Sequence, residues 1–196
     1  MSDERFRGAF RVGSARLEGW DYRKPGAYFV TICTGGRRCT LGEVRDEPDG
    51  GATVVVSRAG AIVAEEWLRT EALRPYVRLD GWIVMPNHFH GILALTEPAA
   101  RTAAPVETPR RGVSTMGMSK RPPHRLEAGS LGAIVGQFKS VSTKRIRATC
   151  NPAFAWQPRF HDHVIRNDRE LDYIRRYIAE NPAQWQQDRY YAADAA

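Results

Sequence analysis

Cysteine is scarce in this sequence, and long hydrophobic runs are absent. The chain has three cysteines among 196 residues, and no two of them are separated by two residues. An odd number without such a pair disfavours both a disulfide framework and a cysteine-based zinc site. No apolar run approaches the roughly 18 residues that a membrane span requires, and the N-terminus lacks the apolar stretch of a secretory signal. We therefore expect a cytoplasmic protein with no membrane partner.

Negative charge is also in short supply. Lys and Arg number 29 against 22 Asp and Glu, which gives a net charge of +7. Arginine supplies nearly all of the positive charge, and its planar donor fork suits phosphate better than a compact ammonium does. This balance favours an anionic partner such as nucleic acid, although a GC-rich gene would enrich arginine as well. The lysines are Lys24, Lys120, Lys139 and Lys144.

The chain is long enough for one compact domain, which at this size buries about 70% of the surface of the unfolded chain. Residues 1–26 are polar and rich in arginine, which indicates a basic N-terminal arm. Residues 27–185 are assigned to a single domain. Within it, residues 97–129 lack apolar periodicity and contain several prolines, a composition typical of a mobile loop. Residues 186–196 are assigned to a C-terminal tail.

Apolar periodicity and turn residues predict strands and helices in a regular order. Ser57, Ser130 and Asn167 stand where a helix N-cap is expected, and Pro182 stands near the end of the last helix. The order is strand, helix, strand, strand, helix, strand and a C-terminal helix. Two βαβ units that share one sheet form an α+β, ferredoxin-like βαββαβ fold with helices on one face, and the C-terminal helix is added to this fold. The expected strands are 27–34, the two halves of 77–95, and 156–165, with a minor hairpin within 40–56.

The sharpest local feature is a histidine pair, His88 and His90, in the second half of the 77–95 hairpin. Residues two apart on a strand point to the same face, so both imidazoles project together while Phe89 points to the opposite side. Such a pair can hold one metal ion. The alternative is two hydrogen-bonded surface histidines.

A second polar pair lies on the last predicted helix. Tyr177 and Asn181 are four residues apart and therefore lie on the same helix face. The asparagine carbonyl oxygen could complete a metal site begun by two imidazoles, with the phenol alongside. The alternatives are an interfacial aromatic for Tyr177 and a helix-terminal cap for Asn181.

Four separated segments resemble the REP-associated tyrosine transposases, which belong to the single-tyrosine HUH transposase group. The resemblance covers most of the chain outside 97–129. It implies the ferredoxin-like fold already predicted, together with cleavage and rejoining of single-stranded DNA beside hairpins of palindromic repeats. The segments are RLEGWDYRKPGAYFVTICT (16–34), WIVMPNHFHGIL (82–93), WQPRFHDHVIR (156–166) and YIRRYIAENPAQW (173–185).

The resemblance also implies roles for the two polar pairs. Tyr177 matches the nucleophile that becomes linked to the 5′ phosphate of the cut strand. His88, His90 and Asn181 match the ligands of a divalent metal, Mg²⁺ or Mn²⁺. Ligand softness alone would favour Mn²⁺ or Zn²⁺ over Mg²⁺ for two imidazoles and one amide oxygen.

Further histidines and basic residues are candidates for DNA contacts. His161 and His163 repeat the two-residue spacing, and the resemblance places this segment beside the active site without making it the metal pair. Tyr173, one turn before Tyr177, is the alternative nucleophile, followed by Tyr190 and Tyr191. The residues predicted to bind nucleic acid are Arg16, Arg23, Lys24, Lys139, Lys144, Arg145, Arg159, His163 and Arg166.

Three functions are consistent with these features. The first is a tyrosine transposase acting in the cytoplasm at the nucleoid, on single-stranded DNA with hairpins. The second is a non-catalytic, domesticated binder of single-stranded DNA or RNA hairpins, which needs neither metal nor tyrosine. The third is a hydrolytic metal nuclease that leaves the protein unmodified. The sequence leaves open whether the protein forms a homodimer.

Overall fold

The structure is a computed structural model that describes residues 5–6, 9–10, 19–48, 50–97 and 127–191. Most of the predicted 97–129 loop lies outside these residues, as does Arg16. No helix in the described part of the chain is both long and apolar enough to cross a membrane.

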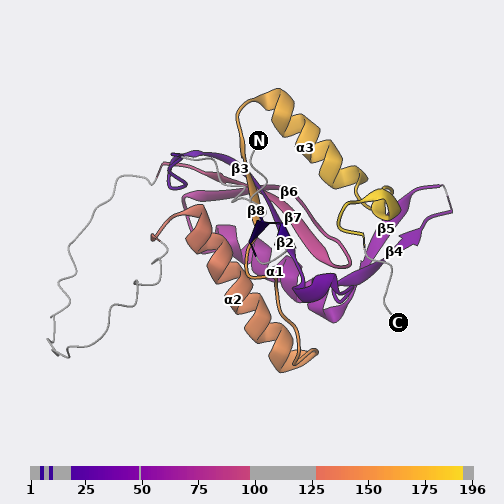
Figure 1. The fold of residues 1–196 in the computed structure, drawn as a ribbon. Helices are drawn as coiled ribbons and strands as arrows, with labels where there is room; N and C mark the ends of the chain where they lie inside the picture. The colour runs from indigo at the N-terminus through magenta and orange to yellow at the C-terminus, as the bar shows by residue number, and fades with distance from the viewer. Residues whose placement is uncertain (1–4, 7–8, 11–18, 49, 98–126, 192–196) are drawn as a thin grey trace, which may run out of the picture.

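A four-stranded antiparallel sheet forms the centre of the fold (Figure 1). Its strands lie in the order β6-β7-β3-β8, and each neighbouring pair is antiparallel. One helix, α1, connects β3 to β6 and another, α2, connects β7 to β8, which confirms the predicted ferredoxin-like βαββαβ arrangement. The strands are β3 (Gly26–Cys33), β6 (Val77–Val84), β7 (His88–Leu95) and β8 (His161–Ile165).

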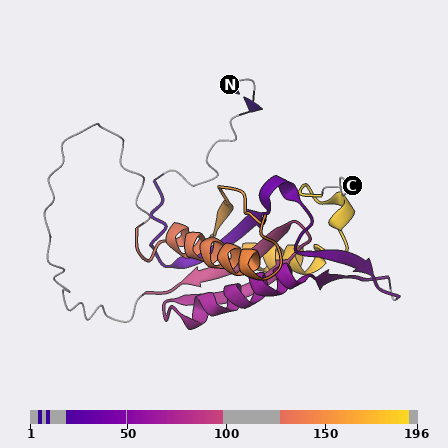
Figure 2. The ribbon, with the colours of Figure 1, turned by 90° about the horizontal axis from the view of Figure 1, so that it is seen from below.

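Three helices pack on the two faces of this sheet. Helices α1 (Arg58–Ala72) and α2 (Leu131–Thr149) lie side by side on one face (Figure 2). Helix α3 (Asp168–Glu180) covers the opposite face (Figure 1). The predicted caps are present, because the side chains of Ser57, Ser130 and Asn167 each accept a hydrogen bond from a backbone N–H in the first turn.

The alternation of side chains along β7 separates two apolar clusters. Phe89 packs against Trp67 of α1 and Phe138 of α2, with ring centroids 4.7 and 5.6 Å away. Ile92 points to the other face, where it joins Ile174 and Ile178 of α3 in a smaller cluster. His88 and His90 lie on this second face, as the strand pattern predicts.

The last core strand is shorter than predicted. We expected it to extend from 156 to 165, but β8 begins at His161, and Trp156 makes only an isolated bridge to Thr34. Pro158 has no N–H for a sheet ladder, and the carbonyls of residues 157–159 accept hydrogen bonds from Lys139 Nζ instead. The intervening chain therefore leaves the sheet.

Smaller elements lie around the central sheet. The predicted minor hairpin is formed by β4 (Gly42–Asp46) and β5 (Ala52–Val56). Two short strands, β1 (Arg5–Phe6) and β2 (Ala9–Phe10), pair near the N-terminus. Two 3₁₀ turns, η1 (Gly35–Arg37) and η2 (Trp185–Gln187), follow β3 and α3 respectively.

The close approach of α1 to the preceding loop provides a test of this packing. A Cβ atom at Gly60 would lie 2.0 Å from the backbone oxygen of Leu41. Gly→Ala inside a helix normally stabilises a protein by up to about 1 kcal/mol. We expect Gly60→Ala to destabilise this one by more than about 1 kcal/mol, because backbone must move to relieve the overlap. Urea denaturation measures the change, and a gain in stability would contradict so close an approach of helix and loop.

Candidate active site

The histidine pair lies fully buried between the sheet and the chain that follows α3. The rings of His88 and His90 have centroids 4.5 Å apart, and their Nε2 atoms are separated by 3.0 Å. The predicted common face is therefore present, but these are not surface histidines. Their nitrogens converge on one point.

Hydrogen bonds from neighbouring side chains orient both imidazole rings. Asn87 donates through Nδ2 to the carbonyls of Arg37 and Tyr190, so its Oδ1 faces His88 Nδ1 at 2.9 Å. His88 must then donate from Nδ1, which leaves its Nε2 as an acceptor facing His90 Nε2 at 3.0 Å. Thr31 Oγ1 lies 2.8 Å from His90 Nδ1 and holds the second ring in place. Support of this kind on the outer nitrogen is typical of metal-binding histidines.

Burial keeps both imidazoles neutral at physiological pH. Desolvation lowers the pKa of His88 to about 4, an effect that the nearby Asp188 carboxylate and Asn181 side chain oppose. Desolvation also lowers the pKa of His90 well below its ordinary value, and His88 adds to this shift. Neutral imidazole is the form that binds metal ions.

Tyr177 reaches the histidine pair from α3. Its hydroxyl lies 3.3 Å from His90 Nε2, and its ring makes an edge-on contact with Phe29. The hydroxyl is also 3.4 Å from Asp188 Oδ2, to which it donates. Burial, followed by the Asp188 charge, raises the pKa of Tyr177 to about 12, whereas Arg189 acts in the lowering direction. The phenol is therefore protonated in this arrangement.

Asn181 contributes an unsatisfied acceptor to the same centre. The residue is 1% exposed, and its Nδ2 donates to Asp188 Oδ2 at 2.9 Å. Its Oδ1 is buried without a hydrogen-bond partner of normal geometry. Because buried polar atoms are almost always paired, this orphaned oxygen beside the facing Nε2 atoms of His88 and His90 fits a bound cation. The residues present thus fit the divalent metal that the family resemblance implies.

Asp188 was missed by the sequence interpretation, which placed it in a C-terminal tail. One of its carboxylate oxygens and one ring nitrogen from each of His88 and His90 lie within 4.8 Å of one another. Asp188 follows η2 in a stretch without apolar periodicity, so no pattern pointed to it. Only its acidic side chain, close in sequence to Tyr177 and Asn181, could have suggested a role.

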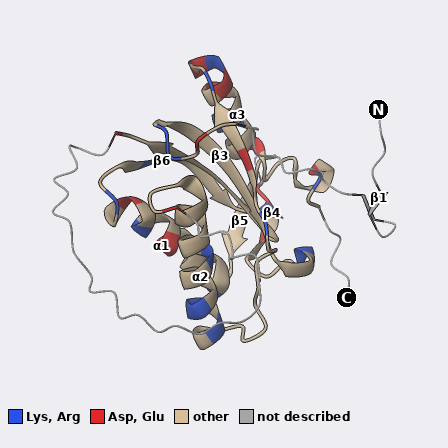
Figure 3. Ribbon diagram, turned by 60° about the vertical axis from the view of Figure 1, so that its left-hand side comes forward, with Lys and Arg blue, Asp and Glu red and all other residues tan. Residues whose placement is uncertain are grey.

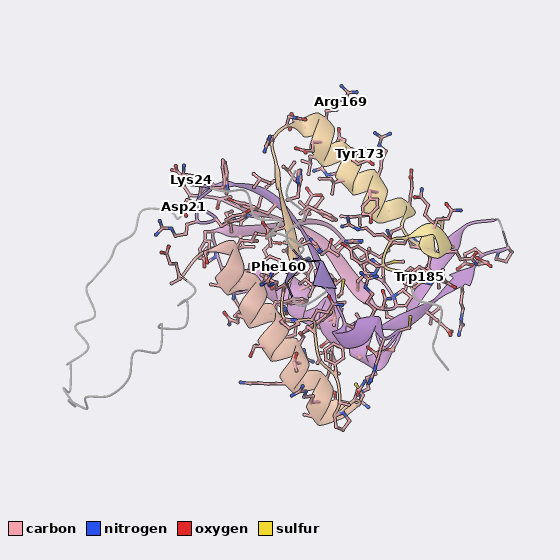
Figure 4. All side chains as sticks on the ribbon, viewed as in Figure 1. Asp21, Lys24, Phe160, Arg169, Tyr173 and Trp185 are labelled. Atoms are coloured by element: carbon pink, nitrogen blue, oxygen red, sulfur yellow. The ribbon has the colours of Figure 1, made fainter. Side chains whose placement is uncertain are left out.

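The rest of this C-terminal segment, residues 182–191, also folds back over the histidine pair. Tyr190 is buried, and its ring centroid lies 4.9 Å from that of His88 and 6.0 Å from that of His90. Trp185, labelled in Figure 4, lies 5.9 Å from His88. Tyr173, the alternative nucleophile, is 64% exposed on the surface of α3 (Figure 4).

An ion pair fastens α3 to the edge of the sheet. The Arg175 guanidinium donates to both carboxylate oxygens of Asp80, at 2.9 and 2.7 Å. Asp80 lies in the irregular step of β6 between Leu79 and Trp82, where its side chain also accepts from the Gly81 N–H. This bidentate contact, together with the isoleucine cluster, sets the position of Tyr177 relative to β7.

Several residues predicted to contact DNA are engaged within the chain. Lys139 Nζ donates to three backbone carbonyls, and burial lowers its pKa. Arg145 binds the carboxylates of Glu65 and Glu66. Arg23 binds Asp21 and Glu127, and Lys24 lies 5.6 Å from the centre of the Trp20 ring. Asp21 and Lys24 are labelled in Figure 4.

The remaining predicted contacts are exposed. Lys144 contributes to the basic end of α2, which is visible in Figure 3. Arg159 and Arg166 precede and follow β8, and His163 on that strand lies 2.6 Å from Glu170 through its Nε2 atom. His161 is exposed on the same strand, paired in register with Thr31 rather than buried with the histidine pair.

Comparison with known proteins supports the fold. No family model matches this chain. An uncharacterised protein of Haemophilus influenzae is 29% identical over 179 residues, which cover 91% of this chain and 92% of that protein. A REP-associated tyrosine transposase, whose structure was solved bound to a REP hairpin, superimposes with a TM-score of 0.52 at 20% identity, over 92% of this chain and 91% of the other. A candidate transposase from Deinococcus radiodurans covers 84% of this chain and 95% of its own at 16% identity, with a TM-score of 0.40.

The Asp80–Arg175 contact can be measured with a double-mutant cycle. We expect Asp80→Asn and Arg175→Gln to show a coupling free energy of unfolding of up to about 1 kcal/mol, since both partners are partly exposed. Arg175 lowers the pKa of Asp80, so this stabilisation is present at neutral pH and is lost as the pH falls below about 4. Asp172 and Arg175 form a more exposed pair that serves as the control. Equal coupling in the two pairs would contradict a special role for Asp80.

Proposed function

We propose that this protein is a single-stranded DNA transposase that cuts and rejoins strands through a covalent 5′-phosphotyrosine. The observation that carries the proposal is the meeting of Tyr177 with the histidine pair, since the phenolic oxygen lies 3.3 Å from His90 Nε2. These residues come from β7 and α3, which are far apart in the sequence. A partly buried phenol beside two neutral imidazoles and an unpaired amide oxygen is consistent with such chemistry.

The sequence resemblance and the shared fold support the same proposal. The solved relative of the same fold is described as a transposase bound to a REP hairpin, which makes hairpin-forming DNA the substrate class to test first. Such an enzyme would act in the cytoplasm at the nucleoid. It would need no second copy of the chain, because Tyr177, the histidine pair and Asn181 meet within one molecule.

Each residue of the site has a task in this reaction. The Nε2 atoms of His88 and His90 and the Oδ1 atom of Asn181 would hold the metal. Mg²⁺ or Mn²⁺ bound there would polarise the scissile phosphate and offset its developing charge. Tyr177 attacks the phosphorus through its phenolic oxygen. Asp188 Oδ2, which accepts the hydroxyl hydrogen bond, takes the phenolic proton as the new bond forms.

The products of this step conserve the energy of the broken bond. As the tyrosine oxygen bonds to phosphorus, the bond to the 3′ oxygen of the preceding nucleotide breaks, and that oxygen leaves as an alkoxide that solvent protonates to the 3′ hydroxyl. The 5′ phosphate stays on Tyr177. A second 3′ hydroxyl can then attack this phosphotyrosine and join a new pair of strands, with Tyr177 regaining its proton. No water molecule attacks the phosphorus, which distinguishes the enzyme from a hydrolytic nuclease.

Covalent trapping tests the proposal. We expect the protein, incubated with Mn²⁺ and a single-stranded oligonucleotide that forms a palindromic hairpin, to give a protein–DNA adduct visible by denaturing electrophoresis and mass spectrometry. Tyr177→Phe and chelation of the metal should each abolish the adduct. Tyr173→Phe, an exposed tyrosine one turn away, is the matched control and should retain it. An adduct that persists in Tyr177→Phe would contradict the assignment, and hairpin binding without any adduct would favour the non-catalytic binder.

Metal titration tests the ligand set without any DNA. We expect His88→Ala and Asn181→Ala to weaken Mn²⁺ binding by about tenfold or more, because each removes a direct ligand. Asp188→Asn should change the affinity by less and instead slow adduct formation, since its carboxylate accepts the phenolic proton. Isothermal titration calorimetry measures these affinities. A loss in Asp188→Asn as large as that in Asn181→Ala would make Asp188 a metal ligand.

A further inference from the structure

We propose that Arg37 and Arg189, named here the arginine pair, bind a backbone phosphate of the DNA strand at the rim of the histidine site. This inference rests on the proposed function, which it deepens by assigning a phosphate subsite. Neither arginine was among the residues that the sequence suggested for DNA contact. The ligand class is a phosphodiester within single-stranded DNA.

The arginine pair joins two segments that are distant in the sequence. Arg37 ends the η1 turn after β3, whereas Arg189 lies in the C-terminal segment. Arg37 Nη1 donates to the backbone carbonyl of Arg189 at 3.2 Å. Both guanidiniums lie over the Tyr190 ring, at 5.6 Å for Arg37 and 4.6 Å for Arg189, and Arg189 also donates to the Tyr190 hydroxyl. The Tyr190 ring is thus in contact with two guanidinium groups.

No acidic side chain in the described part of the chain forms an ion pair with the arginine pair. Both arginines are exposed, and within the part of the chain that the structure describes no carboxylate lies at ion-pair distance from either guanidinium. Arg23, Arg145 and Arg175 differ in this respect, because each binds at least one acidic side chain. Two adjacent guanidiniums without acidic partners attract an anion, and their forked donors match the oxygens of a phosphate.

The arginine pair lies next to the chemistry proposed above. The ring centroid of Tyr190, which both guanidiniums contact, lies 4.9 Å from that of His88, with the two ring planes tilted by 43°. A phosphate held by the pair would therefore be close to the scissile phosphate in the strand.

The backbone at Arg37 is strained. Its φ angle is 55°, and among the described residues it is the only non-glycine residue with positive φ. A side chain in this left-handed region costs energy that glycine would avoid. Strain of this kind is found where function requires a side chain in a fixed place. Here it places the Arg37 guanidinium beside Arg189 and the Tyr190 ring.

The binding experiment uses the full chain carrying Tyr177→Phe, so that no cleavage is needed. We expect Arg37→Gln and Arg189→Gln each to weaken binding of a hairpin oligonucleotide with a single-stranded flank by about tenfold. Each should also reduce the slope of log affinity against log salt by about 0.7, the value for one lost phosphate contact on a single strand. Arg38→Gln is the matched control, because Arg38 is an exposed neighbour of the same charge outside the pair. Affinities and salt slopes of Arg37→Gln and Arg189→Gln that equal those of Arg38→Gln would overturn the proposal.

A chemical variant of the DNA identifies the phosphate itself. Neutral methylphosphonate links are placed one at a time through the single-stranded flank. At one position we expect the methylphosphonate to weaken DNA binding by the Tyr177→Phe protein. The same link should cause no further loss of affinity in the double variant Arg37→Gln/Arg189→Gln. Equal losses in both proteins at every position would overturn the assignment. Competition with inorganic phosphate distinguishes a site for the DNA backbone from a site for free phosphate. Displacement of the oligonucleotide at millimolar phosphate would show a site for the free anion instead.

A glycine variant separates binding from folding. Arg37→Gly relieves the positive φ angle, so we expect it to melt at the same temperature as the parent or higher while losing affinity as Arg37→Gln does. Retained affinity in Arg37→Gly would contradict the role of the side chain. If the parent chain with Tyr177 intact forms no adduct, the transposase proposal fails, whereas the salt and methylphosphonate results still decide whether the pair binds phosphate.

Discussion

The close approach of two neutral imidazoles in a buried space is the constraint on which the other parts of the site rely. With Nδ1 of His88 held by Asn87 and Nδ1 of His90 held by Thr31, both Nε2 atoms turn toward the same point, 3.0 Å apart. Burial keeps both imidazoles uncharged, and the unpaired Asn181 Oδ1 is a third atom that could ligate a metal ion. Such a convergence is costly for a core and useful for holding a cation, which is why we assign it to function rather than to packing.

The scaffold brings Tyr177, the proposed nucleophile, to this point through two different kinds of contact. Isoleucines of β7, β8 and α3 press the helix against the sheet, and Arg175 fixes its edge to Asp80. The apolar contacts stabilise the packing of α3 on the sheet but are not directional. The bidentate ion pair fixes the orientation of the helix and contributes little to stability. Together they leave Tyr177 half-buried, with its phenolic oxygen close to His90 Nε2.

The C-terminal segment, residues 182–191, adds three side chains to the surroundings of the histidine pair. It contributes Asp188 as a carboxylate beside the phenol, Tyr190 as a ring over the histidines, and Arg189 as a cation at the rim. Because Arg37 binds the carbonyl of Arg189, this segment is tied to the turn after β3. The proposed proton acceptor Asp188 and the proposed phosphate-binding Arg189 are therefore held in place by the same short stretch of backbone.

The order of strands and helices could be predicted from the sequence, because strand alternation and helix caps are local properties, and so could the common face of His88 and His90. Five residues are proposed for catalysis and metal binding, and four of them could be named in advance from residue spacing and from the family resemblance: Tyr177, His88, His90 and Asn181. Only the folded chain shows that Lys139 and Arg145 are engaged in internal polar contacts. It alone also shows that Arg37 and Arg189 contact the Tyr190 ring and have no carboxylate partner among the described residues. The same holds for Asp188, because an irregular segment carries no periodic signal and its position follows only from what it packs against.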